Sequence, residues 1–449
     1  MLSLMQLAEE LATGRRSARQ LTEECLDRIA DPDGQGAATY IKVLALPARA
    51  EADAIDRLRA AGVSVSPLAG IPVSVKDLFD IAGHVTTAGT RVLRSRPPAS
   101  ADARVVSRLR AAGLIVIGRT NMTELAYSGL GLNPHYGTPL NPFDRATGRI
   151  PGGSSSGAAV SVADGMAHGA LGTDTGGSCR IPAALCGVVG FKPTAERVPR
   201  AGVVMLSSTL DSVGPLARTV SCCALLDAVL SGDELRVPDP CSLRALRLLL
   251  PESYVLEDLE PVVAQSFERA LETLSAAGAH IARAPLRELL RLPQIHTKGG
   301  FSAAESYAEY RHILDAHADA IDPHVAVRIL KGREQTAADY LDLQRARSEM
   351  QRSVRKVMAG FDAVVMPTAP ISAPPLQELA DDTSYFRANA LVLRNPAIAN
   401  FLDGCAISIP VQRTGEAPVG LMLMGENGRD RALLSIARAA ESVLSPRTV

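Results

Sequence analysis

The sequence contains no tryptophan, and aromatic residues make up only 4% of it. Platforms that bind single-stranded nucleic acids stack bases on aromatic side chains, so this scarcity argues against such a surface. An excess of one charge is also missing, because 47 basic residues face 48 acidic residues and leave a net charge of −1. Binding to phosphate backbones needs a basic surface. The composition therefore predicts no nucleic-acid partner.

Long apolar runs are absent as well. No run of about 18 apolar residues occurs, which predicts that no segment spans a membrane. The first residues, MLSLMQLAEELATGRR, carry Glu9 and Glu10 within their apolar pattern and no positively charged start. This pattern is typical of an amphipathic helix and not of a secretory signal. No pair has the C-x-x-C spacing among the seven cysteines, which are Cys25, Cys179, Cys186, Cys222, Cys223, Cys241 and Cys405. We expect free thiols in a reducing compartment, and hence a cytoplasmic protein.

Short apolar segments alternate with helical patterns along the 449 residues. Strands are expected at 70–75, 114–117, 246–250, 363–366, 405–411 and 419–424. Helices are expected from Ser17 onward and at 47–61, 101–112, 121–128, 157–165, 257–277 and 430–444. This alternation predicts an α/β fold with a large mixed, mostly parallel twisted sheet that helices cover on both faces. No linker is evident, so we expect a single domain over 1–449, with an N-terminal helical segment at 1–62 and a helical cap at 300–358.

Small residues dominate the stretch 151–194, which contains the serine clusters GGSSSG at 152–157 and DTGGS at 174–178. Glycine lets the backbone approach closely and aim successive N–H groups at one point. An oxyanion site needs that arrangement. The segment GIPVSVKD at 70–77 adds Lys76 in an apolar setting. A serine, a lysine and glycine-lined donors together suggest acyl transfer.

A hydroxyl group becomes a nucleophile only when a neighbouring base takes its proton. None of the eight histidines lies in a triad motif, and neither G-x-S-x-G nor the nucleotide-binding glycine patterns occur. Lys76 can act as the base if it is neutral. Burial among Ile71, Val73, Val75 and Leu78 would lower its pKa by disfavouring the ammonium. Because the S-x-x-K spacing is absent around Lys76, the serines must come from elsewhere in the chain.

These segments resemble the amidase signature family of serine amidohydrolases. The resemblance rests on 152–157, 172–182 and 70–77, and it extends over nearly the whole chain. It includes TTAGT, IGRTNMTELA, STLDSVGP, MPTAP and PVGLMLMG at 86–90, 117–126, 208–215, 366–370 and 418–425. The resemblance implies the amidase signature fold. By position it makes Ser178 the acylated nucleophile, Ser154 the bridging serine after a cis peptide bond, and Lys76 the base. It also implies an oxyanion hole from the backbone N–H groups of Thr175, Gly176, Gly177 and Ser178.

Other residues of the two clusters have weaker claims to a role. Ser155 and Ser156 rival Ser154 by residue type, and position favours Ser154. Asp174 and Arg180 match family positions and are interpreted as supports of the loop. The remaining polar residue, Cys179, stands where the family usually has a branched aliphatic side chain; we expect a buried thiol there and treat a thiol mechanism as the alternative.

The predicted function is hydrolysis of a small-molecule carboxamide through a serine acyl-enzyme, which yields a carboxylate and ammonia or an amine. One alternative is the glutaminase (A) subunit of a tRNA-dependent amidotransferase. That function needs a site for the glutamine α-amino and α-carboxylate groups, which 300–411 does not reveal. An alternative of another class is a non-catalytic binding protein that retains the fold. We expect no cofactor, no metal ion and no partner besides the amide substrate, with a homodimer as the default assembly.

Overall fold

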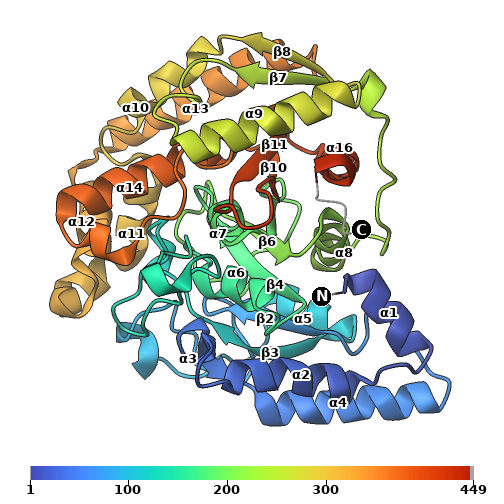
Figure 1. The fold of residues 1–449 in the computed structure, drawn as a ribbon. Coiled ribbons are helices and arrows are strands. Elements are labelled where there is room, and N and C mark those ends of the chain that lie inside the picture. The colour runs from blue at the N-terminus through green and yellow to red at the C-terminus, as the bar shows by residue number, and fades with distance from the viewer. Residues whose placement is uncertain (1, 445–449) are drawn as a thin grey trace.

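The computed structural model describes residues 2–444 (Figure 1). The strands are β1 (Tyr40–Val43), β2 (Pro72–Lys76), β3 (Ile115–Thr120), β4 (Gly169–Asp174), β5 (Val189–Lys192), β6 (Ser212–Ala217), β7 (Arg247–Pro251), β8 (His280–Ala284), β9 (Ala363–Pro367), β10 (Cys405–Pro410) and β11 (Gly420–Gly425). They form one 11-stranded sheet in the order β1-β3-β2-β4-β6-β5-β10-β11-β9-β7-β8. The last strands of the chain, β10 and β11, therefore lie inside the sheet and not at its edge.

The sheet is mixed, as predicted, but the expectation that it is mostly parallel is wrong. Parallel pairing joins β2 to β3 and β4, and β7 to β8 and β9. The six other neighbouring pairs are antiparallel. The connection between β10 and β11 spans only residues 411–419. A parallel pair needs a longer crossover, so short connections of this kind produce antiparallel neighbours.

Helices pack on both faces of the sheet (Figure 1). The helices are α1 (Leu4–Ala12), α2 (Ala18–Ala30), α3 (Gly36–Thr39), α4 (Ala45–Ala60), α5 (Arg104–Ala111), α6 (Ser156–Ala163), α7 (Arg180–Cys186), α8 (Val220–Ser231), α9 (Pro261–Ala276), α10 (Leu292–Ile295), α11 (Gly300–His317), α12 (Pro323–Leu330), α13 (Ala337–Met358), α14 (Asp382–Arg394), α15 (Pro396–Leu402) and α16 (Asp430–Leu444). Helices α6 and α7 contact each other and the central strands, and α8 contacts α16. The predicted α/β layering is confirmed.

Local signals in the sequence give several helix ends correctly. Ser17 and Gln20 form the expected capping box, in which each side chain accepts the backbone N–H of the other residue. Helix α4 ends at Ala60, two residues before Gly62. The region 300–358 is mostly helical, because it comprises α11, α12 and α13 with short turns between them. Within residues 2–444, no helix combines the length and apolarity needed to cross a bilayer.

The helix expected at 121–128 is absent, and only a 3-10 turn (Glu124–Ala126) forms there. Leu125 and Ala126 have φ angles of 49° and 60°, in the left-handed region. The backbone of this segment bonds to distant segments instead of to itself. Leu125 N–H donates to the Ala88 carbonyl (2.9 Å), and Asn121 N–H donates to the Thr39 carbonyl (2.8 Å). Tertiary contacts thus override a helical sequence pattern in this segment.

Candidate active site

Lys76 is the last residue of β2 and is completely buried. Its Nζ atom donates to Ser154 Oγ at 2.8 Å and to Thr173 Oγ1 at 2.9 Å. Burial lowers the pKa of Lys76 to about 8, although nearby acidic groups oppose the shift. About a tenth of the amines would then be neutral at pH 7, whereas an ordinary lysine is almost wholly charged. The lysine predicted as the base therefore lies in contact with the predicted bridging serine.

Ser154 lies in the loop that leads into α6, and it is also completely buried. The peptide bond between Gly153 and Ser154 is cis, as the family resemblance implied. Backbone contacts hold this loop in place. Gly153 N–H donates to the Gly129 carbonyl at 2.8 Å, and Thr123 N–H donates to the Ser154 carbonyl at 3.1 Å. A side chain at Gly153 would meet Thr123 Oγ1 at 2.7 Å, so the loop needs glycine there.

The two neighbouring serines point to other partners. Ser155 Oγ donates to the Thr173 carbonyl at 3.3 Å, and Ser156 Oγ donates to the Asn121 carbonyl at 3.5 Å. Neither hydroxyl is hydrogen-bonded to Lys76. The geometry thus favours Ser154 over Ser155 and Ser156 as the partner of the lysine.

Ser178 lies in the turn between β4 and α7, and only 3% of its surface is exposed. Its carbonyl accepts the N–H of Ser155 at 3.3 Å, which ties the two serine loops together. Among residues 2–444, no hydrogen bond joins the Ser154 and Ser178 hydroxyl groups. The structure therefore brings the two serine clusters together at the ends of α6 and β4, with the lysine contact made through Ser154.

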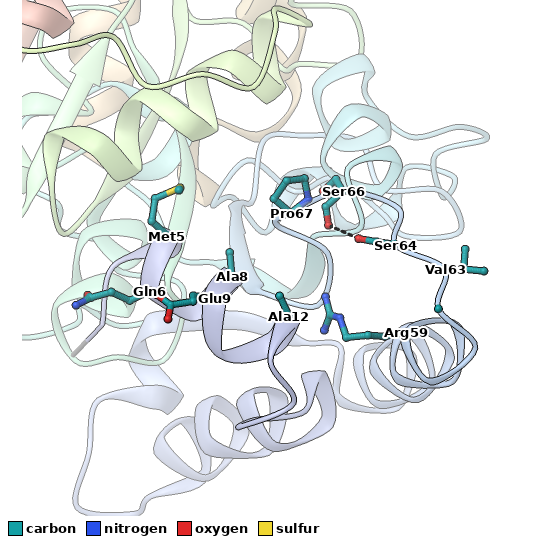
Figure 2. A pocket seen from close by; sticks show the side chains of 11 residues that line it. Met5, Gln6, Ala8, Glu9, Ala12, Arg59, Val63, Ser64, Ser66 and Pro67 are labelled. Carbon is teal, nitrogen blue, oxygen red and sulfur yellow. Dashed lines mark hydrogen bonds between the residues drawn. The ribbon is translucent and has the colours of Figure 1, made fainter.

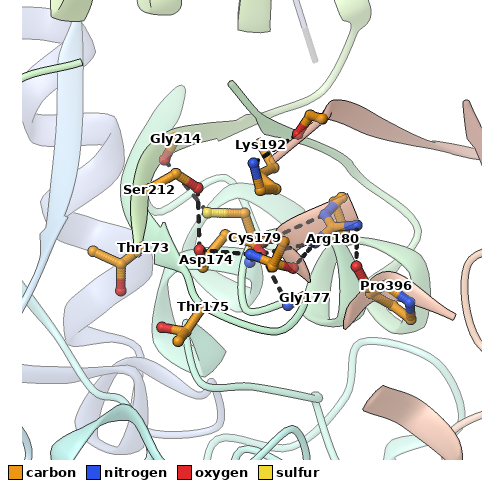
Figure 3. A network of polar contacts seen from close by, with 12 residues as sticks. Thr173, Asp174, Thr175, Gly177, Cys179, Arg180, Lys192, Ser212, Gly214 and Pro396 are labelled. Atoms are coloured by element: carbon orange, nitrogen blue, oxygen red, sulfur yellow. Dashed lines mark hydrogen bonds and ion pairs between the residues drawn. The ribbon is translucent and has the colours of Figure 1, made fainter. Parts of the chain in front are cut away.

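Asp174 organises the loop around Ser178 (Figure 3). Its carboxylate accepts the N–H groups of Gly177 (2.8 Å) and Cys179 (3.1 Å), which flank Ser178. The Arg180 guanidinium pairs with both carboxylate oxygens, at 3.0 and 2.8 Å. Burial would raise the pKa of Asp174, but the Arg180 charge and its hydrogen bonds outweigh burial and hold that pKa at about 2. Asp174 and Arg180 thus support the loop, as the sequence suggested.

The hydrogen bond from Gly177 to Asp174 changes the expected oxyanion hole. Because the Gly177 N–H group already has an acceptor, it is not available to a developing oxyanion. Within the described part of the chain, the N–H groups of Gly176 and Ser178 have no protein acceptor. Gly177 is still required as glycine, because its φ angle is 130° and a Cβ there would meet Pro396 Cβ at 2.5 Å.

Sequence analysis missed Thr173, which accepts the second hydrogen bond of Lys76. Thr173 lies on β4, beside β2, in parallel register with Val75 opposite Leu171. Only the pairing of these two strands brings its hydroxyl to the lysine. The signal in the sequence is a single polar residue between Gly172 and Asp174.

Histidines and metal-ligand clusters take no part in this arrangement. In residues 2–444, no histidine is hydrogen-bonded to Lys76, Ser154 or Ser178. Nor does this part of the chain contain a group of three or more His, Cys, Asp or Glu side chains placed to hold a metal ion. Cys179 is buried, and burial raises the pKa of its thiol far above the usual range. A charged thiolate beside Ser178 is therefore strongly disfavoured.

A surface groove of about 560 Å³ lies between α1 and the loop that follows α4 (Figure 2). Met5, Glu9, Arg59, Val63 and Pro67 are among the residues that line it. None of the predicted site residues is in this groove. The candidate active site is instead defined by its buried polar contacts.

Comparison with known proteins agrees with this site. The family model Amidase matches residues 20–434. The chain is 37% identical to the 2-amino-5-chloromuconic acid deaminase of Comamonas testosteroni, over 88% of this chain and 86% of the relative. It is 34% identical to the A-type component of the glutamyl-tRNA(Gln) amidotransferase of Chromohalobacter salexigens, over 97% and 95%. A crystal structure of an amidase superposes with a TM-score of 0.89 and 33% identity, over 99% of this chain and all of that chain.

The chain belongs to the amidase family. It is an enzyme that hydrolyses C–N amide bonds, so the predicted family, fold and reaction class are confirmed.

Proposed function

We propose that Ser178, Ser154 and Lys76 hydrolyse a small-molecule carboxamide through an acyl-enzyme on Ser178. The observation that carries this assignment is the 2.8 Å hydrogen bond from Lys76 Nζ to Ser154 Oγ, made where burial lowers the pKa of the lysine. A buried, partly neutral amine in contact with a hydroxyl can take its proton. Ser178 follows from its place beside two unpaired N–H groups and from the hydrogen bond between the two serine loops.

The proposed reaction proceeds by two proton relays. Ser178 Oγ bonds to the amide carbon while its proton passes to Ser154 and the proton of Ser154 passes to Lys76. The N–H groups of Thr175, Gly176 and Ser178 stabilise the oxyanion. The C–N bond then breaks, and the relay returns the proton to the leaving nitrogen. Water attacks the ester by the same route and releases a carboxylate. The Ser154 and Ser178 hydroxyls need to meet only in the substrate complex, where catalytic hydrogen bonds tighten.

We also propose that the chain acts as one domain and that the helices in 300–358 cover the substrate site. Ser178 is almost wholly shielded from solvent, which supports a cover of this kind. Helix α12 supplies Arg328, whose guanidinium donates to the Tyr127 carbonyl at 2.6 Å. Tyr127 lies two residues before Gly129, which accepts the Gly153 N–H beside Ser154. The cover thus reaches the loop that holds the bridging serine.

A panel of small amides tests the assignment of Ser178. We expect the purified chain to release ammonia or amine from at least one aliphatic, aryl or dicarboxylic half-amide, and Ser178→Ala to abolish that release. Ser442→Ala is a matched control, because Ser442 lies on α16 and its hydroxyl donates only to the Ala439 carbonyl. Substantial hydrolysis by the Ser178→Ala variant would remove Ser178 from its role.

The relatives named as amidotransferase subunits support a second candidate, a glutaminase that supplies ammonia to a partner chain. The same amide panel includes glutamine. Ammonia release from glutamine only in the presence of a second subunit would favour this candidate over a free-standing amidase. A chain that binds amides without hydrolysing any of them would support the third candidate, a binding protein that retains the fold.

We propose a homodimer as the assembly and the cytoplasm as the location. The seven cysteines are all free, which supports a reducing compartment. Light scattering after size-exclusion chromatography tests the assembly, since a dimer has twice the mass of the 47.2 kDa chain. A mass of one chain at micromolar concentration would contradict the dimer.

A further inference from the structure

Two helices of the 300–358 region hold the segment 203–211, which precedes β6. The Glu305 carboxylate of α11 accepts four hydrogen bonds, from Ser207 Oγ, Thr209 N–H (3.0 Å), Thr209 Oγ1 and Tyr340 OH (2.8 Å). Tyr340 belongs to α13. One turn further along α11, the Tyr310 hydroxyl donates to the Met205 carbonyl. The side chains of α11 and α13 therefore fix this segment at several points.

The same segment touches both halves of the candidate active site. Val204 N–H donates to the Leu78 carbonyl at 2.9 Å, two residues beyond Lys76. The Asp211 carboxylate accepts the N–H groups of Leu206 (2.9 Å) and Ser207 (3.1 Å) on one oxygen. Its other oxygen accepts the Thr175 hydroxyl at 2.5 Å. A continuous chain of hydrogen bonds thus leads from Glu305 to the first residue of the Ser178 loop.

The donor set suits a carboxylate and no other side chain of that size. All four donors are neutral, and within residues 2–444 no Lys, Arg or His nitrogen lies within ion-pairing distance of Glu305. A carboxylate has two oxygens that can accept all four bonds, whereas an amide would turn an NH₂ group toward donors. Removing the charge should therefore loosen the segment while it leaves the size of the side chain unchanged.

We propose that Glu305 is a positioning residue for acyl transfer, which acts through Ser207 and Asp211 on Thr175 to hold the N–H groups beside Ser178 in place. This inference rests on the proposed role of Ser178. Glu305 touches neither the serines nor the lysine, so it takes no proton in the reaction. Its effect is on the geometry of the loop, where small displacements of the donors weaken stabilisation of the oxyanion.

A fluorophosphonate reagent measures this effect without knowledge of the natural substrate. Ser178 Oγ forms a bond to phosphorus, the P–F bond breaks, fluoride leaves and the serine proton enters the relay. We expect Glu305→Gln to slow labelling of Ser178 by at least about tenfold, because misplaced donors cost that much or more. Glu309→Gln, on an exposed position of the same helix, should stay within about twofold of the wild type. An equal labelling rate for Glu305→Gln and wild type would overturn the proposal.

A double-mutant cycle separates positioning from a merely structural role. Thr175→Val removes the hydroxyl that Asp211 accepts. If Glu305 acts through Thr175, adding Glu305→Gln to Thr175→Val should change the labelling rate little further. Independent effects that multiply would overturn the proposal, because Glu305 would then act only on the stability of the helices.

Two further outcomes are covered by the design. If Glu305→Gln does not fold, Tyr340→Phe removes a single donor and keeps the ring that packs on Phe301. It should slow labelling about fivefold, in the wild-type background but not in Thr175→Val. Equal rates for Tyr340→Phe and wild type would then contradict the proposal. A wild-type chain that is not labelled at Ser178 would instead refute the proposed catalytic function itself.

Discussion

At the scale of single residues, the charge of Lys76 decides whether the proposed chemistry can occur. The amine donates to two hydroxyl groups, and no carboxylate lies within ion-pairing distance of it in the described residues. Hydroxyl groups solvate an ammonium less well than water does. Burial is accordingly the largest influence on its pKa, which falls from the ordinary 10.5 to about 8.

This lowered pKa predicts the pH dependence of hydrolysis. Only the neutral amine accepts a proton, and the neutral fraction rises as the pH approaches about 8 from below. We expect kcat/KM for an uncharged amide such as propionamide to rise about tenfold per pH unit below that value and to level off above it. Unfolding midpoints measured at each pH separate catalysis from stability. A profile that is flat from about pH 6 to about pH 9, with a stable fold throughout, would contradict a lysine base.

At the scale of secondary-structure elements, α6 is the part whose packing places Ser154. Gly157 lies in its first turn, and its N–H donates to the Asn121 carbonyl at 3.0 Å. A Cβ at Gly157 would meet Asn121 N at 2.7 Å, closer than real side chains approach a backbone atom. The helix therefore lies directly against the segment after β3, and glycine is what permits the contact.

Gly157→Ala should for this reason destabilise the fold. The methyl group would force α6 away from Asn121, and overpacking of this kind costs about 1–3 kcal/mol. Gly360→Ala is the matched control, because its nearest foreign atom would be Arg247 NH2 at 3.9 Å, and it should change stability by less than about 0.5 kcal/mol. Urea unfolding followed by far-ultraviolet circular dichroism measures both. Equal stabilities for the two variants would show that α6 does not need this close approach.

Elements with strong local signals were predictable, and those that depend on distant partners were not. The buried helix expected at 157–165 corresponds to α6, because its small residues and its glycines mark its ends. The direction of strand pairing is a different matter, since an apolar strand carries no mark of its neighbour. The segment 121–128 failed for a related reason: its backbone bonds to Thr39 and Ala88, which the local pattern does not contain.

The candidate site shows the same division. Lys76, Ser154 and Ser178 could be identified because family motifs surround each of them. Thr173 required the pairing of β2 with β4, and Glu305 required the contact of α11 with the segment before β6. The role expected for Gly177 changed because Asp174 takes its N–H, a contact that no spacing in the sequence reveals.

At the scale of the whole molecule, the fold buries nearly all of its thiols. Cys25, Cys179, Cys186, Cys222, Cys223 and Cys405 are buried, and Cys241 is partly exposed. Burial raises the pKa of the Cys186 and Cys405 thiols well above the usual range, and such thiols react slowly.

Reaction with Ellman's reagent should therefore count about one thiol in the native protein. In denaturant without reductant, all seven cysteines should react. Fewer thiols in denaturant would reveal disulfides and contradict the free cysteines of this structure. Rapid reaction of several thiols in the native protein would show that the packing of the central helices is looser than described.

The reaction itself unites the three scales, because the buried lysine, the helix that places Ser154 and the closed fold serve one covalent step. The most direct measurement is peptide mapping by mass spectrometry of the protein quenched in acid during turnover of an amide. The account predicts an acyl group on Ser178 that is absent from Ser178→Ala and does not accumulate in Lys76→Ala. An acyl group on Cys179, or one that persists after Ser178→Ala, would contradict it.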